Sequence, residues 1–433
     1  MRCLSFFRAH SIITLRIKRM PSQFLPKKKS YVCRHNGRRL QIGGTVTMTI
    51  KRTLILSLTV CCTACGIFEH DGQGGFQLPV PESSTGAEPK IFDLGNQQML
   101  DELTGLLGEK RAVFVGEVHD RLEHHQNQLR IIQSLYARYP DLAIGVEYFQ
   151  QPFQPYLDDY IAGRIDEKEM LIKTEYFKRW QLDYRMLQPI FKFAREKHIP
   201  VLALNISDEI HNKVFKGGMK SLSPQERSST PDDIEPASEH YLQRLKTIFD
   251  SHPPSNDFGT FVEGVLLWDS SMADITARYL KAHPQSHMVV LAGMVHIMYG
   301  DGIPERVNHR LGGNPSALLI NSSDFGKYPG IADYLLATAG NKELPKAGLL
   351  GVSILDGEDS VYVSEFPSSS AAQAAGIKVG DHILALDGMK VANMTELKAT
   401  MFDKLPGDRV QVTVRRNNVM GSKQELQFEV MLR

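Results

Sequence analysis

Short apolar runs alternate with helical stretches between residues 91 and 325, and this alternation constrains the fold more than any other feature of the sequence. Each run is apolar almost throughout, which is typical of a strand buried on both faces, and the helices supply the crossovers that parallel strands need. The pattern predicts an α/β domain with a mostly parallel sheet covered by helices on both faces. The expected strands are residues 112–116, 142–147, 200–205, 287–293 and 316–321.

Polar side chains stand at the ends of several of these runs. Glu117 and His119 follow the first run, Glu147 ends the second, Asn205 ends the third and His296 lies just past the fourth. Because the carboxyl ends of parallel strands meet at one edge of a sheet, we expect these groups to line one crevice. Glu117, His119, Glu147 and His296 are a plausible set of ligands for Zn, Mn or Fe, and Glu117 with His119 could act catalytically on metal-bound water. The alternative is a set of satisfied structural polar groups.

Charge is distributed unevenly along the chain. Residues 1–64 carry 13 of the 50 Lys and Arg residues and none of the 49 acidic residues, so the chain from Cys65 onward is acidic. Nucleic-acid binding needs a basic face, so we expect no nucleic-acid partner. All five cysteines lie at or before Cys65, so any metal ligands in the body must be His, Glu, Asp or Tyr.

A targeting signal is predicted at residues 48–64. Lys51 and Arg52 precede an apolar stretch of about 12 residues, which is too short to cross a bilayer but suits a secretory signal. It ends in Thr63-Ala-Cys-Gly66, which resembles a bacterial lipoprotein processing box with Cys65 as the lipidated residue; an ordinary secretory signal is the alternative. Because Met48 looks like the natural start, we expect residues 1–47 to be an extension without structure. Residues 65–90 read as a flexible tether rich in Gly, Pro and Ser.

The chain changes character after a predicted linker at residues 326–345. Residues 346–433 contain short strands and turns and resemble a bacterial PDZ domain. Such a domain can bind protein C-termini or extended peptides by adding them as a strand to an open sheet edge. The expected peptide-binding residues are Gly348, Leu349, Leu350 and Gly351, with Leu397 on a helix near 394–401 as a pocket residue. Docking on the neighbouring domain is the alternative role.

Several motifs in residues 91–325 resemble the ChaN-like haem-uptake lipoproteins, which are grouped with the Tiki metalloproteases. They are Gly116-Glu-Val-His-Asp120 with His124-His125-Gln126; Gly145-Val-Glu-Tyr-Phe149; Trp180, Tyr184 and Leu187 with Val201-Leu-Ala-Leu-Asn205; Leu267-Trp-Asp-Ser-Ser-Met-Ala273; and Ala292-Gly-Met-Val-His296 with Tyr299-Gly-Asp-Gly-Ile-Pro304.

The resemblance implies a lipoprotein of the bacterial envelope, anchored in the outer membrane and facing the periplasm, that binds haem as a homodimer for iron uptake. It also implies a tyrosine as iron ligand, for which we order the candidates Tyr184, Tyr176 and Tyr148, with His124 and His125 as further residues near the cofactor. Ferric haem suits a phenolate ligand.

Three functions are therefore weighed. The first, which we favour, is haem binding by an envelope lipoprotein with a PDZ module. The second is a metal-dependent hydrolase or protease of the Tiki type that uses the Glu and His groups at the strand ends. The third is a non-catalytic PDZ scaffold at the membrane.

Overall fold

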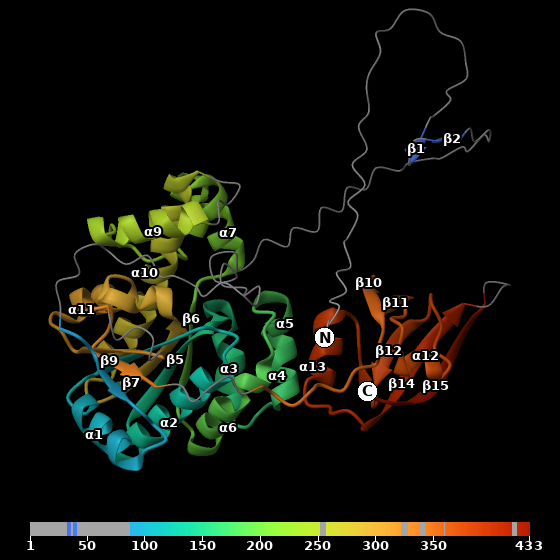
Figure 1. The fold of residues 1–433 in the computed structure, drawn as a ribbon, viewed down its shortest axis with the longest axis horizontal. Helices are drawn as coiled ribbons and strands as arrows, with labels where there is room; N and C mark the ends of the chain where they lie inside the picture. The colour runs from blue at the N-terminus through green and yellow to red at the C-terminus, as the bar shows by residue number, and fades with distance from the viewer. Residues whose placement is uncertain are drawn as a thin grey trace, which may run out of the picture. The chain divides into compact units, whose positions relative to one another are not determined.

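The computed structural model describes residues 87–251, 257–321, 328–337, 343–358, 360–417 and 422–433, and the backbone of two short strands before them (Figure 1). By its contacts the chain divides into Met1–Leu58 and Thr59–Arg433. In the first unit β1 (Cys33–His35) pairs antiparallel with β2 (Arg38–Leu40), where we predicted no structure. The predicted signal peptide and Cys65 lie outside the described residues.

A seven-stranded, fully parallel sheet organises the larger domain, as predicted. Its strand order is β3-β9-β8-β4-β7-β5-β6. The five strands expected from the apolar runs are all present. The strands are β3 (Lys90–Phe92), β4 (Ala112–Glu117), β5 (Leu142–Gln150), β6 (Val201–Asn205), β7 (His287–Gly293), β8 (Ser316–Ile320) and β9 (Tyr334–Leu336).

Successive residues of each strand face opposite sides of the sheet, and each side has its own apolar core. On β4, Val113 and Val115 belong to one core, whereas Ala112 and Phe114 belong to the other. Burial on both faces explains why the strands are apolar throughout. The first core is covered by α1 (Gln97–Leu107), α2 (Leu122–Arg138), α3 (Gln154–Ile161), α4 (Glu167–Lys173) and α6 (Gln188–Lys197), and the second by α10 (Phe258–Ala282) and α11 (Ile303–Leu311).

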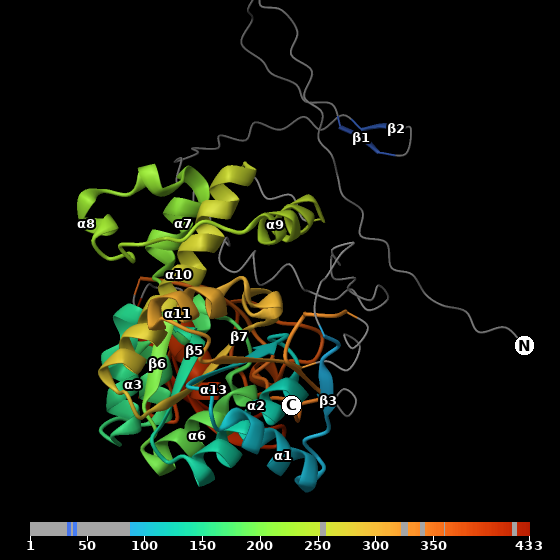
Figure 2. The ribbon, with the colours of Figure 1, turned by 90° about the vertical axis from the view of Figure 1, so that its left-hand side faces the viewer.

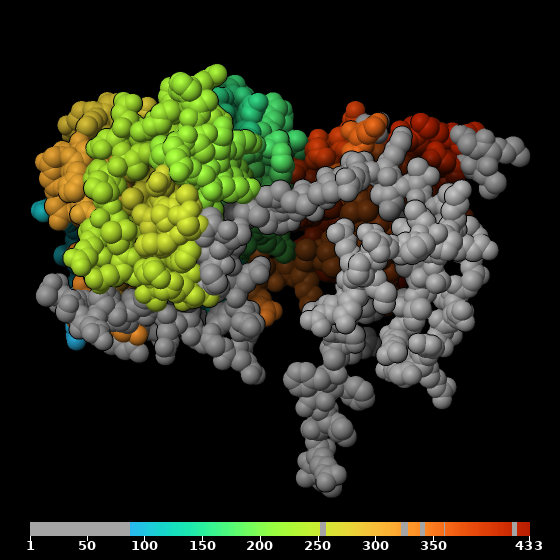
Figure 3. Space-filling view, turned by 90° about the horizontal axis from the view of Figure 1, so that it is seen from above, coloured from blue at the N-terminus to red at the C-terminus, as the bar shows by residue number. Residues whose placement is uncertain are grey.

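A group of helices between β6 and β7 stands over the end of the domain (Figures 1 and 2). It comprises α7 (Asp208–Gly217), η4 (Met219–Ser221), α8 (Pro224–Arg227) and α9 (Glu239–Ser251), and we call it the lid. Its own apolar cluster joins Phe215, Tyr241 and Leu245 to Phe261 at the start of α10. Seen from above, the lid covers that end of the domain (Figure 3). The stretch that we read as a loop or lid, residues 217–236, therefore contains η4 and α8.

One domain boundary differs from the prediction. Residues 326–345 were expected to be a linker, but Tyr334–Leu336 form β9 between β3 and β8. The reason is burial, because the side chains of Leu335 and Leu336 are fully enclosed in the two cores of the sheet. Lys90, placed at the end of the predicted tether, is likewise the first residue of β3.

The C-terminal domain is an antiparallel sheet with the order β10-β11-β12-β14-β15, to which β13 adds beside β12. Strand β10 lies at an edge of the sheet, as predicted. Among the described residues, no helix has both the length and the apolar character to cross a membrane. The elements are β10 (Ser353–Asp356), β11 (Val361–Glu365), α12 (Ala371–Ala374), β12 (His382–Leu386), β13 (Met389–Lys390), α13 (Met394–Met401), β14 (Arg409–Asn417) and β15 (Lys423–Met431).

Candidate functional site

Four neighbouring strands bring the predicted polar groups to one end of the sheet. Strands β4, β7, β5 and β6 are adjacent, so the chain after each of their carboxyl ends meets the others. Glu117 ends β4, Glu147 lies near the end of β5, Asn205 ends β6, and His296 lies in η5 (Met294–His296) directly after β7. All four side chains are buried.

Glu117 is the centre of one hydrogen-bonded group. Its carboxylate accepts hydrogen bonds from His119 Nδ1 at 2.8 Å, from the hydroxyl of Tyr148 and from Nε2 of Gln128. Burial alone would raise the pKa of Glu117, but His125, His119 and the hydroxyl of Tyr148 together lower it to about 2. Burial lowers the pKa of His119, whereas Glu117 and Glu147 raise it by more, so the net shift is upward.

Asp269 and Glu147 flank His296 in a second buried group. His296 Nδ1 donates to Asp269 at 2.7 Å, and Nε2 lies 3.7 Å from Glu147 without a hydrogen-bond partner. Glu147 accepts from the backbone N–H of Gly293 at 2.7 Å, and Asp269 accepts from the hydroxyl of Tyr241 at 2.6 Å. Although burial lowers the pKa of His296, the Asp269 carboxylate raises it by more. Asp269 therefore holds His296 in place from α10.

The structure does not support a metal centre at Glu117, His119, Glu147 and His296. Within the described residues, no three or more His, Cys, Asp or Glu side chains are grouped closely enough to hold a metal ion. The physical reason is that the Glu117 carboxylate already accepts hydrogen bonds from three donors, and one of these donors is Nδ1 of His119. Of the four residues, Glu117 and His119 bond each other, whereas His296 is hydrogen-bonded to Asp269 rather than to Glu147.

A narrow pocket lies beside these pairs, between the strand ends and the lid. It is lined by Tyr148, Gln150, Arg179, Trp180, Asn205, Asp208, His211 and Trp268. Both tryptophans of the chain are therefore in this pocket. The rings of His119 and Trp180 meet edge to face with centroids 4.9 Å apart, so the pocket wall rests directly on the Glu117–His119 pair.

Two nitrogens in the pocket wall have no hydrogen-bond partner. Trp268 Nε1 and His211 Nε2 are both buried and unpaired, although buried polar atoms are normally satisfied. Burial, with His296 as a further cause, lowers the pKa of His211 to about 4, so its imidazole is neutral near pH 7. The rings of His211 and Trp268 lie 4.5 Å apart and those of Trp268 and His296 lie 5.2 Å apart. The cavity between these rings measures only about 10 Å³, room for about one water molecule, so a larger ligand could enter only if the lid moved away from the strand ends.

The adjacent histidines of α2 are structural in this fold. Nδ1 of His124 accepts the backbone N–H of Val118 at 2.9 Å, and His125 bonds the carbonyl of His119 at 2.9 Å and Gln128 at 3.0 Å. Burial, followed by the neighbouring His125, lowers the pKa of His124 to about 3. These bonds keep the loop after β4 in place, and neither histidine lines the pocket.

The three candidate tyrosines occupy different surroundings. Tyr184 is fully buried, and its hydroxyl donates to Glu167 at 3.1 Å; burial and Glu167 raise its pKa well above the usual value. Tyr176 packs on Tyr184 in the interior. Only Tyr148 among the three lines the pocket.

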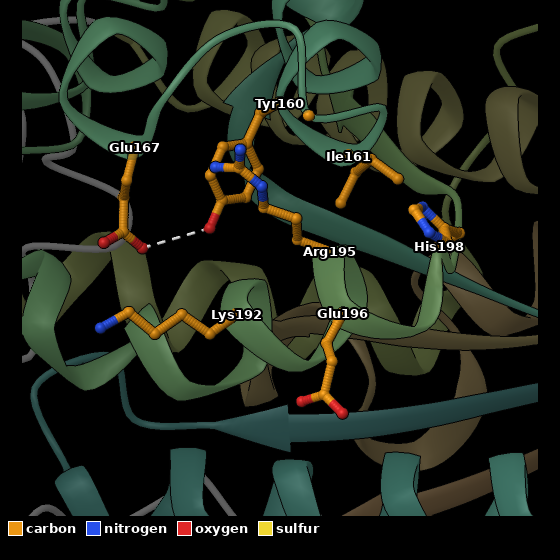
Figure 4. A pocket seen from close by; sticks show the side chains of 8 residues that line it. Tyr160, Ile161, Glu167, Lys192, Arg195, Glu196 and His198 are labelled. Carbon is orange, nitrogen blue, oxygen red and sulfur yellow. Dashed lines mark hydrogen bonds between the residues drawn. The ribbon is translucent and has the colours of Figure 1, made fainter.

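A second, open pocket of about 450 Å³ lies on the flank of the domain (Figure 4). Figure 4 shows the hydroxyl of Tyr160 directed to Glu167, a contact of 3.3 Å, and the guanidinium of Arg195 stacks on the Tyr160 ring at 4.8 Å. Exposed side chains of α6 complete its wall, among them Lys192 and Glu196. It contains none of the residues predicted to form a site.

The residues predicted to bind a peptide in the PDZ domain lie in different surroundings. Leu350 and Leu397 are buried, whereas Leu349 is 61% exposed. The N–H groups of Gly348 and Leu349 donate to the carbonyls of Lys404 and Arg433, so these two cannot also hold a peptide carboxylate.

Sequence reasoning missed several residues around the pocket. Trp268 and Asp269 lie within the motif Leu267–Ala273, but nothing in one sequence shows which face of the 25-residue α10 points to the strand ends. Arg179, His211 and Tyr241 come from segments far away along the chain. They stand among other polar residues on amphipathic helices, so nothing in the sequence distinguishes them from a solvated face.

Comparisons with known proteins agree with this architecture. Residues 103–307 match the family model described as haem-binding uptake, Tiki superfamily, ChaN, and residues 348–430 match that of the PDZ domain. A solved structure titled cofacial heme binding to ChaN of Campylobacter jejuni is 17% identical, with a TM-score of 0.45 over 57% of this chain and 96% of that chain.

The other relatives match the C-terminal domain. A serine protease Do-like HtrA of Lactobacillus helveticus is 37% identical over 60 residues, which is 14% of each protein. The chain thus spans only a small part of that relative. The HtrA3 PDZ domain bound to a phage-derived ligand, FGRWV, is 21% identical, with a TM-score of 0.17 over 20% of this chain and 85% of that chain.

The chain thus joins a parallel sheet with a buried strand-end site to a smaller antiparallel domain. Residues 103–307 match the ChaN family model, and residues 348–430 form a PDZ domain.

Proposed function

We propose that this protein binds haem in the pocket between the strand ends and the lid. The observation that carries the proposal is the convergence of Tyr148, Trp180 and Trp268 on one pocket within the region that matches the haem-binding family. Aromatic faces pack well against a porphyrin ring, and the unpaired nitrogens of Trp268 and His211 offer hydrogen bonds to its polar edge. The residues present therefore fit the cofactor in their chemistry, and the proposal requires the lid to move, because the cavity of about 10 Å³ is far smaller than a porphyrin.

Tyr148 is our proposed iron ligand, ahead of Tyr176 and Tyr184, because it alone of the three reaches the pocket. Burial and the Glu117 carboxylate raise the pKa of Tyr148 well above its usual value, so its phenol is protonated in the free protein. The Tyr148 hydroxyl donates its hydrogen bond to Glu117, so the phenolate oxygen could hold a cation only after this proton has left to solvent. A bound haem would supply a ferric iron that favours this anionic oxygen.

The cellular setting is the second part of the proposal. A lipid on Cys65 would anchor the protein in the bacterial outer membrane, with the folded domains in the periplasm, where it would handle haem for iron uptake. The acidic body and the lipoprotein box support this setting. A homodimer is expected because the haem-uptake resemblance implies one, and the PDZ domain would recognise the C-termini or extended segments of partner proteins.

A haemin titration with tyrosine variants tests the site. Absorbance in the Soret region should rise to a stoichiometric end point for the wild type, and a mass measurement of the complex tests the dimer. Tyr148→Phe should change the Soret spectrum and weaken binding, whereas Tyr184→Phe, which leaves the pocket intact, should bind as the wild type does. A full effect of Tyr184→Phe with none of Tyr148→Phe would assign the ligand to Tyr184 and reject this pocket.

A further inference from the structure

Helix α13, which we expect to form one wall of the peptide groove of the PDZ domain, also packs against the larger domain. Leu397 of α13 belongs to the apolar core of the PDZ domain. Ala399 and Phe402 belong instead to the first core of the large sheet, and Phe402 meets Tyr184 edge to face at 5.5 Å. The two domains therefore share α13 as a structural element.

Polar contacts fix this interface at its edges. Lys168 Nζ lies 3.3 Å from the carbonyl of Thr400 and 3.1 Å from the carboxylate of Asp403. Arg185 donates to the carbonyl of Pro345 at 2.7 Å, just before the PDZ domain begins. Contacts from both ends of the interface hold α13 against α4 and the short helix α5 (Tyr176–Arg179).

Helix α5 connects this interface to the pocket. It packs on α13, and Arg179 with the next residue, Trp180, lines the pocket. Trp180 contacts both His119 and Tyr148, with ring centroids 4.9 and 5.4 Å apart. One short segment thus contacts the groove helix of the PDZ domain and forms part of the pocket wall.

The backbone at both ends of this segment is in an unusual conformation. Glu175 has φ of +52° and Gln181 has φ of +66°, and neither is glycine. Left-handed conformations are strained in residues other than glycine and cluster at switches and ligand clamps. Residues at the ends of short elements are also where hinge motions are absorbed.

We propose that segment 175–181 couples the peptide groove of the PDZ domain to the pocket, so that occupation of one site changes the affinity of the other. A peptide that moves α13 would displace α5 and Trp180, and a ligand that moves Trp180 would act back on α13, because coupling between two sites is reciprocal. The existence of a ligand in the pocket rests on the proposed function. The proposed movement of segment 175–181 does not depend on that function.

Tryptophan fluorescence tests the coupling without any ligand. Both tryptophans lie in the pocket, so Trp268→Phe in the full chain leaves Trp180 as its single reporter. In that background, Phe402→Ala removes the contact with Tyr184, and Lys168→Met removes the polar contacts while preserving side-chain bulk. Both should shift the emission maximum of Trp180. Val414→Ala, a fully buried change in the PDZ core away from the interface, is the matched control and should not.

Haemin affinity gives the second readout. Phe402→Ala should change it by at least about fivefold, the lower end of typical allosteric coupling, and Val414→Ala should leave it unchanged. An unaltered Trp180 emission in folded Phe402→Ala and Lys168→Met would overturn the coupling, as would an equal shift in the Val414→Ala control. If the wild type binds no haemin, the haem proposal fails, but the emission shift still decides the coupling.

Discussion

At the scale of single residues, the centre of the site is a buried carboxylate that ionises unusually easily. Because the folded-state pKa of Glu117 is about 2, below its ordinary 4.5, its ionisation stabilises the fold above pH 4.5, and this contribution is lost as the pH falls toward 2. The difference corresponds to about 3 kcal/mol. Acid should therefore destabilise this end of the sheet progressively between pH 4.5 and 2.

Glu117→Gln should remove this pH dependence. We expect its free energy of unfolding at pH 7 to be lower than that of the wild type and to change less between pH 4.5 and 2.5. Urea unfolding at several pH values measures both. Asp120→Asn, a nearby exposed change, is the control; equal pH slopes for the Glu117→Gln variant and the wild type would show that Glu117 is not ionised as described.

A substitution at Gly293 tests how closely the carboxylate and histidine side chains of the site are packed. A Cβ at this position would lie 3.0 Å from the imidazole ring of His119 and 3.6 Å from Glu147. Gly293→Ala should cost about 1–3 kcal/mol and alter tryptophan emission, since His119 rests on Trp180. Gly313→Ala, where a Cβ meets nothing within 4 Å, should do neither. Equal stability of the two variants would show that His119 is free to move.

At the scale of elements, the lid is held to the body by buried charge as well as by apolar packing. Arg244 of α9 donates through both Nη atoms to Asp301, which lies just before α11, and the Arg244 side chain is 1% exposed. Tyr241 on the same helix bonds Asp269, so the position of the lid bears directly on His296. Moving the lid would therefore disturb the second carboxylate–histidine pair.

Arg244→Met should destabilise the protein by about 3 kcal/mol, because the buried Asp301 carboxylate loses both guanidinium hydrogen bonds and keeps His240 as its remaining side-chain partner in the lid. Chemical unfolding measures the loss. The matched control is Arg278→Met, which breaks an exposed pair with Asp274 and should cost less than about 0.5 kcal/mol. Similar losses in the two variants would mean that the lid does not depend on the buried pair.

The sequence predicted the strands well because each is apolar on both faces, a pattern that few other structures produce. We did not predict strand β9, because its three residues, Tyr334–Leu336, are too few to show a periodicity and lie between Gly- and Pro-rich segments. The strand-end groups were predicted from topology alone. Their division into Glu117–His119 and Asp269–His296 pairs was not, because Asp269 reaches the site from a helix that follows β6 at a distance in the chain.

At the scale of the whole molecule, the PDZ domain helps to bury Tyr184, the first of our three candidate tyrosines. Its motif suggested a ligand, but Phe402 from the PDZ domain covers it, and Glu167 takes its hydroxyl hydrogen bond. This contact joins residues that lie 218 positions apart, so it cannot be predicted from the local sequence around Tyr184 or around Phe402. The tyrosine that faces the pocket, Tyr148, lies directly after one of the best-predicted groups, Glu147.

The central claim is that the pocket between the strand ends and the lid receives haem, and tryptophan quenching during a haemin titration tests it most directly. Both tryptophans line that pocket, so haemin bound there should quench nearly all emission, with the same saturation point as the Soret signal. A saturable Soret signal with unquenched tryptophans would place haem elsewhere on the protein, and the absence of any saturable signal would contradict haem binding itself.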